Sequence, residues 1–111
     1  MSPSIRHRAP EASSLFAALG DPTRLALVRR LSVEGFLSVT ELTEGTRISR
    51  QAVTKHLGVL ARAGLVESAR HGRERLWALA PGQIAQARRA LEQLSREWDD
   101  ALGRLRRLVE R

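Results

Sequence analysis

Two closely spaced helix starts in the middle of the chain constrain its fold more than any other feature. Ser38–Glu41 has the Ser-x-x-Glu pattern of a capping box, which predicts a helix that begins after the serine. Gly45 ends that helix within a few residues, and the next three residues form a turn. Ser49 then caps a second helix, expected over 49–63 with Gly64 as its stop. Two short helices joined by a tight turn are the core of a helix-turn-helix unit.

Two further helices are expected before this unit. Residues 11–19 carry apolar side chains at helical spacing, and Gly20 ends the segment. Asp21 and Pro22 then suit the N-cap and the first position of a second helix, which Gly35 ends. We expect the apolar stripe of this second helix to consist of Leu25, Val28 and Leu31, with Ala26 and Leu27 beside them.

After Gly64 the apolar pattern becomes extended. Residues 65–70 and 74–79 predict a β-hairpin around His71-Gly72-Arg73, with Gly72 supplying a positive φ and Trp77 packing at its base. We expect the whole hairpin, residues 65–79, to form a wing. Phe36 and Leu37 suggest only a short extended connection.

A long helix is expected over 82–109, because no proline interrupts the chain after Pro81. Its apolar residues alternate spacings of three and four from Ile84 to Leu108, as in a heptad seam. The seam has two interpretations, a core within one subunit or a dimer interface. We favour the interface, because so small a domain cannot bury the whole seam by itself. The expected interface residues are Leu15, Phe16, Leu19, Leu91, Leu94, Trp98, Leu102 and Leu105.

Composition excludes several classes of protein. The 111 residues suffice for one domain over 11–111, preceded by a flexible basic leader over 1–10. There is no cysteine, which excludes disulfides, thiolate metal sites and thiol redox sensors. No apolar run is long enough for a membrane helix or a secretion signal, so we expect a cytoplasmic protein with no membrane partner.

The charge balance points to a polyanion. Lys and Arg total 19 against 12 acidic residues, a net charge of +7, and every base except Lys55 is arginine. Arginine matches phosphate oxygens and guanine edges with two parallel hydrogen bonds. A GC-rich genome is the other explanation of the arginine count, but it explains the net charge less well.

The second helix of the helix-turn-helix presents a polar face that suits base edges in the major groove. We assign Arg50, Gln51, Thr54 and Lys55 to the groove and place Ser49 and His56 nearer phosphates. Arg70, Arg73 and Arg75 make the wing basic, which suits phosphates or the minor groove. The other interpretations are an ordinary solvated helix face and an ordinary surface turn.

Three motifs, in this order, resemble the ArsR/SmtB family of winged helix-turn-helix repressors. They are LFAALGDPTRLALVRRL at 15–31, VTELTEGTRISRQAVTKHLGVLARAGLV at 39–66 and HGRERLWAL at 71–79. The resemblance implies a mainly α fold with a small β-hairpin (α-α-α-α-β-β-α) and a long C-terminal dimerisation helix. It also implies a homodimer that represses transcription and is released from its DNA by a signal, often a metal ion.

The chain departs from that family at the metal sites, which use Cys in the short helix or His and acidic residues in the last helix. The short helix here has no Cys and the last has no His, while His7, His56 and His71 are dispersed. The sequence therefore resembles the metal-independent branch, with no metal, no cofactor and an unidentified effector.

The sequence as a whole predicts a sequence-specific DNA-binding regulator, a homodimeric repressor of a palindromic operator in double-stranded DNA. The alternatives are a nonspecific nucleoid-type DNA binder and a winged helix that binds a protein partner. An enzyme is not expected, because no nucleophile–base pair, clustered histidines or Gly-rich loop is visible.

Overall fold

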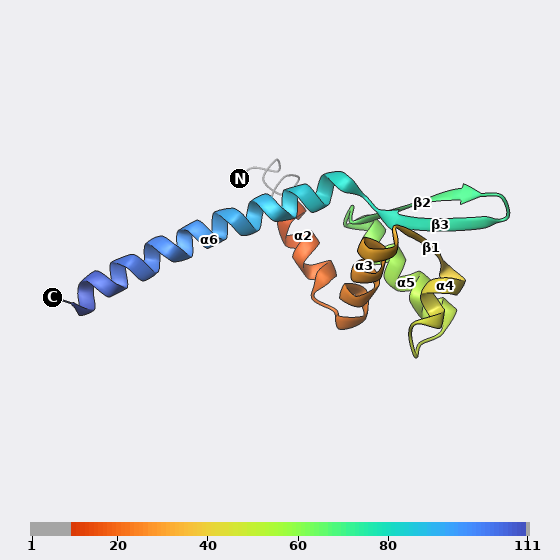
Figure 1. Cartoon of the computed structure of the whole chain (residues 1–111), viewed down its shortest axis with the longest axis horizontal. Coiled ribbons are helices and arrows are strands. Elements are labelled where there is room, and N and C mark those ends of the chain that lie inside the picture. The colour runs from red at the N-terminus through yellow and green to blue at the C-terminus, as the bar shows by residue number, and fades with distance from the viewer. Residues whose placement is uncertain (1–9, 111) are drawn as a thin grey trace, which may run out of the picture.

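A computed structural model describes residues 10–110, with side chains from Ser13 onward, as a small helical body from which one long helix projects (Figure 1). The expected winged helix-turn-helix is confirmed. Of the predicted basic leader, residues 1–9 lie outside the described part, and Pro10 already begins a helix. The elements are α2 (Pro10–Leu19), α3 (Pro22–Glu34), β1 (Phe36–Ser38), α4 (Val39–Glu44), α5 (Arg50–Arg62), β2 (Val66–His71), β3 (Glu74–Leu79) and α6 (Pro81–Val109).

All three predicted side-chain caps are present at the helix starts. Asp21 Oδ2 accepts a hydrogen bond from the backbone N–H of Arg24 at 3.0 Å at the start of α3. Ser38 and Glu41 form the reciprocal capping box of α4, with distances of 3.2 and 2.9 Å. Ser49 Oγ accepts from the third backbone N–H after it at 3.1 Å. Each cap satisfies a backbone N–H that has no partner inside its own helix.

The expected hairpin is part of a three-stranded antiparallel sheet with the order β1-β3-β2. Phe36 and Leu37, which the sequence suggested only as a short extended connection, form a strand with Ser38 that pairs with β3, so that Phe36 lies opposite Ala78. The hairpin turn holds two residues, of which Gly72 has a φ of 65° while Arg73 has a negative φ. A positive φ at the first turn position alone is typical of a type II′ turn, which matches the twist of a hairpin.

The core lies between α2, α3, α4, α5 and the inner face of the sheet. The buried stripe of α3 differs from the predicted one, because Leu27 and Leu31 are buried whereas Leu25 is 43% exposed. Trp77 packs against the core, which confirms its predicted place at the base of the wing. The largest fully buried side chains are Leu15, Leu27, Leu31, Leu42, Val53, Leu57, Leu60 and Leu65.

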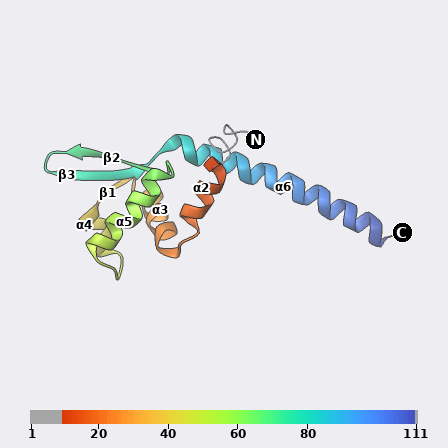
Figure 2. The same cartoon turned by 180° about the vertical axis from the view of Figure 1, so that it is seen from behind.

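Helix α6 begins against α2 and then leaves the body of the protein, as Figures 1 and 2 show from opposite sides. Its 29 residues correspond to a length of about 43 Å. The only buried residue on it is Ala87, near its beginning. Among the described helices none combines the length and the apolar character that a membrane crossing needs.

Candidate nucleic-acid interface

Helix α5 has one face inside the protein and one in solvent. Val53 and Leu57 are fully buried and anchor it to α3, α4 and β2. The opposite side carries only polar and charged side chains near the helix start. The exposed residues of this face are Arg50, Gln51, Thr54 and Lys55, the four that the sequence assigned to the groove.

Ser49 and His56, the two residues assigned to phosphates, are placed differently. The hydroxyl of Ser49 caps α5. His56 Nδ1 lies 3.4 Å from a guanidinium nitrogen of Arg24 and 4.0 Å from Asp21 Oδ2, and its side chain is 23% exposed. Because a guanidinium can only donate, Nδ1 accepts here. His56 thus already fastens α5 to the start of α3, and we omit it from the residues proposed to contact DNA.

Arg24 extends this link to a third helix. Its Nε donates to the carbonyl of Ala18 at 2.7 Å, close to the C-terminus of α2. The same residue's backbone N–H binds Asp21, and this hydrogen bond is the largest cause that lowers the pKa of the Asp21 carboxyl. One cluster of Asp21, Arg24 and His56 therefore joins α2, α3 and α5.

Helix α4 is held at its other end by Arg30 of α3. Arg30 Nη1 donates to the carbonyls of Glu41 and Leu42 at 3.1 and 3.2 Å, and Nε contacts the Glu34 carboxylate at 3.3 Å. The guanidinium lies where a Cβ on Gly45 would be, so the close approach requires the glycine. Sequence reasoning missed Arg30, because α3 and α4 meet only in three dimensions.

Two of the three basic side chains of the wing, Arg73 and Arg75, line one hollow together with Arg50 at the start of α5. Arg73 is at the tip of the hairpin, and Arg75 Nη1 donates to Ser68 Oγ at 2.9 Å. A hollow of about 190 Å³, here called the wing notch, opens between the wing, the beginning of α4 and α5. It is lined by Ser38, Val39, Thr40, Arg50, Arg73, Glu74 and Arg75.

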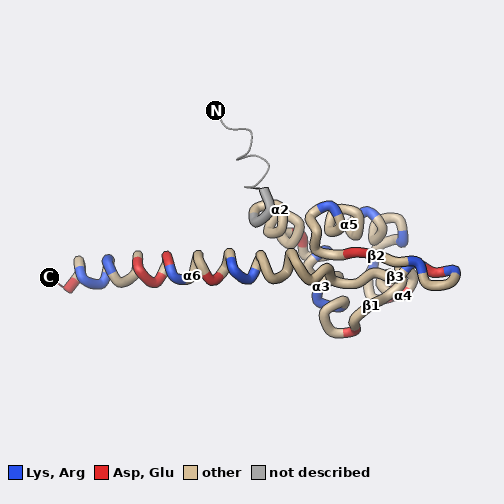
Figure 3. The backbone as a smooth tube through the Cα atoms, turned by 90° about the horizontal axis from the view of Figure 1, so that it is seen from above, with Lys and Arg blue, Asp and Glu red and all other residues tan. Residues whose placement is uncertain are grey.

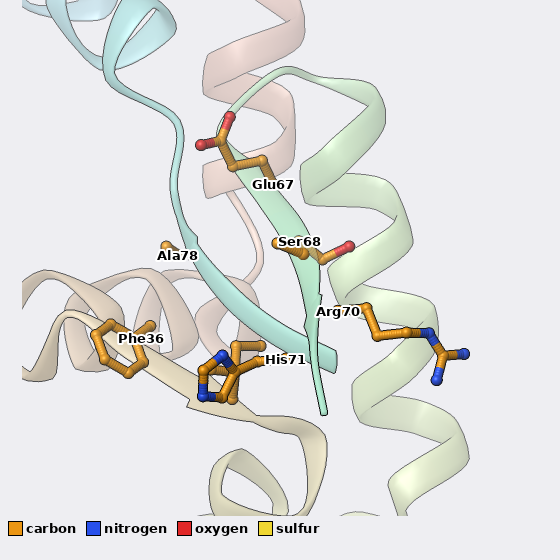
Figure 4. Close-up of a pocket in the computed structure, with 8 residues that line it drawn as sticks. Phe36, Glu67, Ser68, Arg70, His71 and Ala78 are labelled. Carbon is orange, nitrogen blue, oxygen red and sulfur yellow. The ribbon is translucent and has the colours of Figure 1, made fainter. Parts of the chain in front are cut away.

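The wing notch is positively charged, because three guanidiniums oppose one carboxylate. Figure 3 shows the same gathering of basic residues along α5 and at the end of the hairpin. Arginines at such a site can bind the phosphates of a strand that runs from α5 to the wing. Arg70 also points to this side of the sheet, opposite to Phe36 and His71 (Figure 4).

The predicted dimer interface divides into two groups. Leu15 is 0% exposed within the single chain, so the assignment of this residue to a subunit interface is wrong, because it has no surface left for a partner. Leu19 also packs partly against the core, while Phe16 is 38% exposed. The α6 residues Leu91, Leu94, Trp98, Leu102 and Leu105 are all exposed, between 48% and 63%.

Known proteins resemble the chain over nearly its full length. Residues 19–69 match the family described as a helix-turn-helix domain. The chain is 38% identical over 104 residues to the HTH-type transcriptional regulator Rv2034 of Mycobacterium tuberculosis, covering 94% of this chain and 92% of the relative. It is 33% identical over 101 residues to the HTH-type transcriptional repressor SmtB of the same organism, covering 91% and 73%.

A solved structure of another transcriptional regulator is similar to this chain as well. The ArsR-like transcriptional regulator from Rhodococcus sp. RHA1 superposes with a TM-score of 0.75 at 35% identity, over 90% of this chain and 93% of that chain. These relatives are regulators and not enzymes, as the sequence predicted. With the helix-turn-helix, the wing and the long last helix in place, the chain belongs to the ArsR family of DNA-binding winged helix-turn-helix transcriptional regulators.

Proposed function

We propose that this regulator is a homodimeric repressor that reads a palindromic operator with α5 in the major groove and the wing along the backbone. The observation that carries the proposal is the exposed polar face of Arg50, Gln51, Thr54 and Lys55, opposite a fully buried face of the same helix. The major groove is about 12 Å wide and admits a helix presented in this way.

The side chains have distinct tasks in this proposal. Arg50 suits the O6 and N7 acceptors of guanine, Gln51 suits adenine, and the Thr54 methyl suits the methyl of thymine. Lys55 suits acceptors on base edges in the groove, and the wing arginines Arg70, Arg73 and Arg75 bind phosphates, which add affinity without discriminating bases. Base reading is thus the task of α5, and the wing supplies affinity that depends strongly on salt.

The exposed seam of α6 supports a dimer. Trp98 is 63% exposed in the single chain, and large aromatic side chains often form the centre of protein interfaces. A symmetric dimer would present two α5 helices to half-sites roughly 34 Å apart, one turn of DNA. Of the α2 residues predicted for this interface, Phe16 is exposed and available to join it.

A metal trigger does not fit this chain. Helix α4 contains no cysteine, and within residues 13–110 no three side chains of His, Cys, Asp or Glu come together as a metal site would require. His56 is engaged by α3 and His71 is on the wing, far apart in the fold. We therefore assign the regulator to the metal-independent branch, acting in the cytoplasm where its DNA is.

Selection of bound fragments from the source genome, followed by footprinting, tests the operator directly. Gln51→Ala should lose about 1–3 kcal/mol of discrimination at one base pair of each half-site. Arg73→Ala should weaken binding to all sequences alike and lower the salt dependence. Arg62→Ala, in the last turn of α5, is the matched control. It should change neither the discrimination between base pairs nor the affinity for DNA and its salt dependence.

Two results would contradict the proposal. If the double substitution Arg50→Ala and Gln51→Ala left the affinity for the operator unchanged, α5 would not be the helix that binds in the major groove. Equal affinity for the chain's own promoter and for random DNA would instead favour a nonspecific nucleoid-type binder.

A further inference from the structure

The sheet has a second face that the proposed DNA contacts do not use. Leu37, Trp77 and Val66 point to the core, so strand alternation places Phe36, Ala78 and Glu67 on the outer face. These three residues form one row across the sheet, because Phe36 and Glu67 both pair with Ala78. Phe36 keeps 63% of its surface exposed. An exposed aromatic side chain on the outer side of a sheet indicates a surface that can bind a ligand or a protein partner.

A hollow of about 330 Å³ lies on this outer face and is called the outer hollow here. Its floor is low because the small residue Ala78 is in the middle of its row and Ala69 is at the end of the neighbouring row. Its sides are Phe36, Leu76, His71 and Glu67. Figure 4 shows Phe36, His71, Ala78 and Glu67 on one side of the strands and Ser68 and Arg70 on the other. The volume is at the lower end of the range for small-molecule sites, about 300–1,000 Å³.

The charged side chains around the outer hollow determine which class of ligand it can bind. Glu67 and Arg70 are the charged residues along it, and Arg70 points away to the opposite face. Among the described residues Glu67 has no ion-pair partner. Of the two charged residues that line the hollow, Glu67 is therefore the one whose side chain lies on its side of the sheet. A carboxylate beside an exposed phenyl ring attracts organic cations, because both the carboxylate and the ring face are negative.

We propose that the outer hollow binds a small amphipathic organic cation, an arylalkyl or alkyl amine. Its ammonium group pairs with Glu67, and its apolar body covers Ala78 and packs against Phe36 and Leu76. The row from Phe36 to Glu67 spans two strand spacings, roughly 10 Å. A ligand with a ring and an amine joined by a few methylenes matches that span. The site is independent of the proposed operator contacts, which lie on the other face of the sheet.

Three probes of the same shape and different charge test the site: 4-phenylbutylamine, 4-phenylbutanol and 4-phenylbutyrate. The full chain is titrated with each by NMR at pH 8. The amine should bind and shift the backbone amides of 36–38, 66–71 and 74–79. The alcohol should bind about fivefold more weakly, and the acid more weakly still.

Variants separate the two parts of the site. Glu67→Gln should weaken the amine about fivefold and leave the alcohol unchanged. Phe36→Leu keeps an apolar side chain and removes the ring, and should weaken the amine about threefold. Both residues are exposed, so neither variant should disturb folding, which thermal unfolding checks. Glu92→Gln on α6 is the matched control, with no expected effect.

The proposal is overturned by any of three results. The alcohol or the acid binds as tightly as the amine, Glu67→Gln leaves the affinity for the amine unchanged, or the shifted amides lie elsewhere. If Phe36→Leu dissociates the protein and no probe binds, the outer face is a contact between copies of the chain, and the proposal is refuted.

Discussion

The contact between Arg30 and the end of α4 can be tested in isolation from DNA binding. Arg30→Ala removes two hydrogen bonds to the carbonyls of Glu41 and Leu42 and one ion pair to Glu34. Those carbonyls are in the last turn of α4, where a helix supplies few backbone donors, and the carbonyl of Leu42 also accepts from the backbone N–H of Gly45 at 3.3 Å. The variant should therefore loosen the first helix of the helix-turn-helix without touching the groove face.

The size of the effect follows from the exposure of the groups. A hydrogen bond to a charged group contributes about 1.5–3 kcal/mol when well shielded. The Arg30 side chain is 30% exposed and Glu34 45%, so water replaces part of each contact and the ion pair adds only about 0.3–0.5 kcal/mol. We expect the free energy of unfolding to fall by about 2 kcal/mol in total.

Urea unfolding at one fixed protein concentration measures this loss, since the stability of a dimer depends on concentration. Arg29→Ala is the matched control, because Arg29 is exposed and its side chain has no hydrogen bond or ion pair among the described residues. It should change stability by no more than about 0.5 kcal/mol. Equal losses in the two variants would refute the role of Arg30.

Gly45→Ala provides a second test of the same contact. The φ of Gly45 is −91°, which alanine adopts freely, so the only obstacle to the added methyl is the Arg30 guanidinium. The substitution should therefore be destabilising in the wild type and nearly neutral in Arg30→Ala. A double-mutant cycle with no coupling energy would contradict this geometry.

Three further predictions concern other parts of the chain. In urea unfolding, Ser38→Ala should lower the free energy of unfolding by about 1 kcal/mol. Glu41→Ala added to Ser38→Ala should lower this free energy by less than Glu41→Ala does alone. The pKa of Asp21 is lowered chiefly by the N–H of Arg24, so its contribution to stability is complete above its ordinary pKa of 3.8 and is lost as the pH falls through the lower folded value. Asp21→Asn should remove that part of the acid dependence in unfolding followed between pH 2 and about 5. Trp98→Ala should weaken the dimer by about 2 kcal/mol in sedimentation equilibrium, whereas an unchanged dissociation constant would place the interface elsewhere.

The helix starts could be predicted because a cap is a local structure, contained in four consecutive residues. Asp21, Ser38 and Ser49 each bind a backbone N–H three residues ahead, so the signal and the partner are in the same segment. Strand β1 could not be predicted in this way, because three residues show no alternation and its partner strand begins 36 positions after Ser38. The buried stripe of α3 was misassigned because apolar residues fill 25–28 without interruption, and such a run does not distinguish one face from another.

The candidate interface shows the same distinction within one helix. At 100° per residue, Gln51 and Lys55 lie on the side of α5 opposite Val53, so their exposure follows from the sequence alone. His56 lies only about 60° from Val53, at the border of the buried face. At such a border the neighbouring element decides the role of the side chain, and here Arg24, 32 residues earlier, takes the imidazole into the cluster that joins three helices. Polar residues at the centre of a helix face can therefore be assigned to a ligand from sequence, whereas those at the border require the packing of the whole domain.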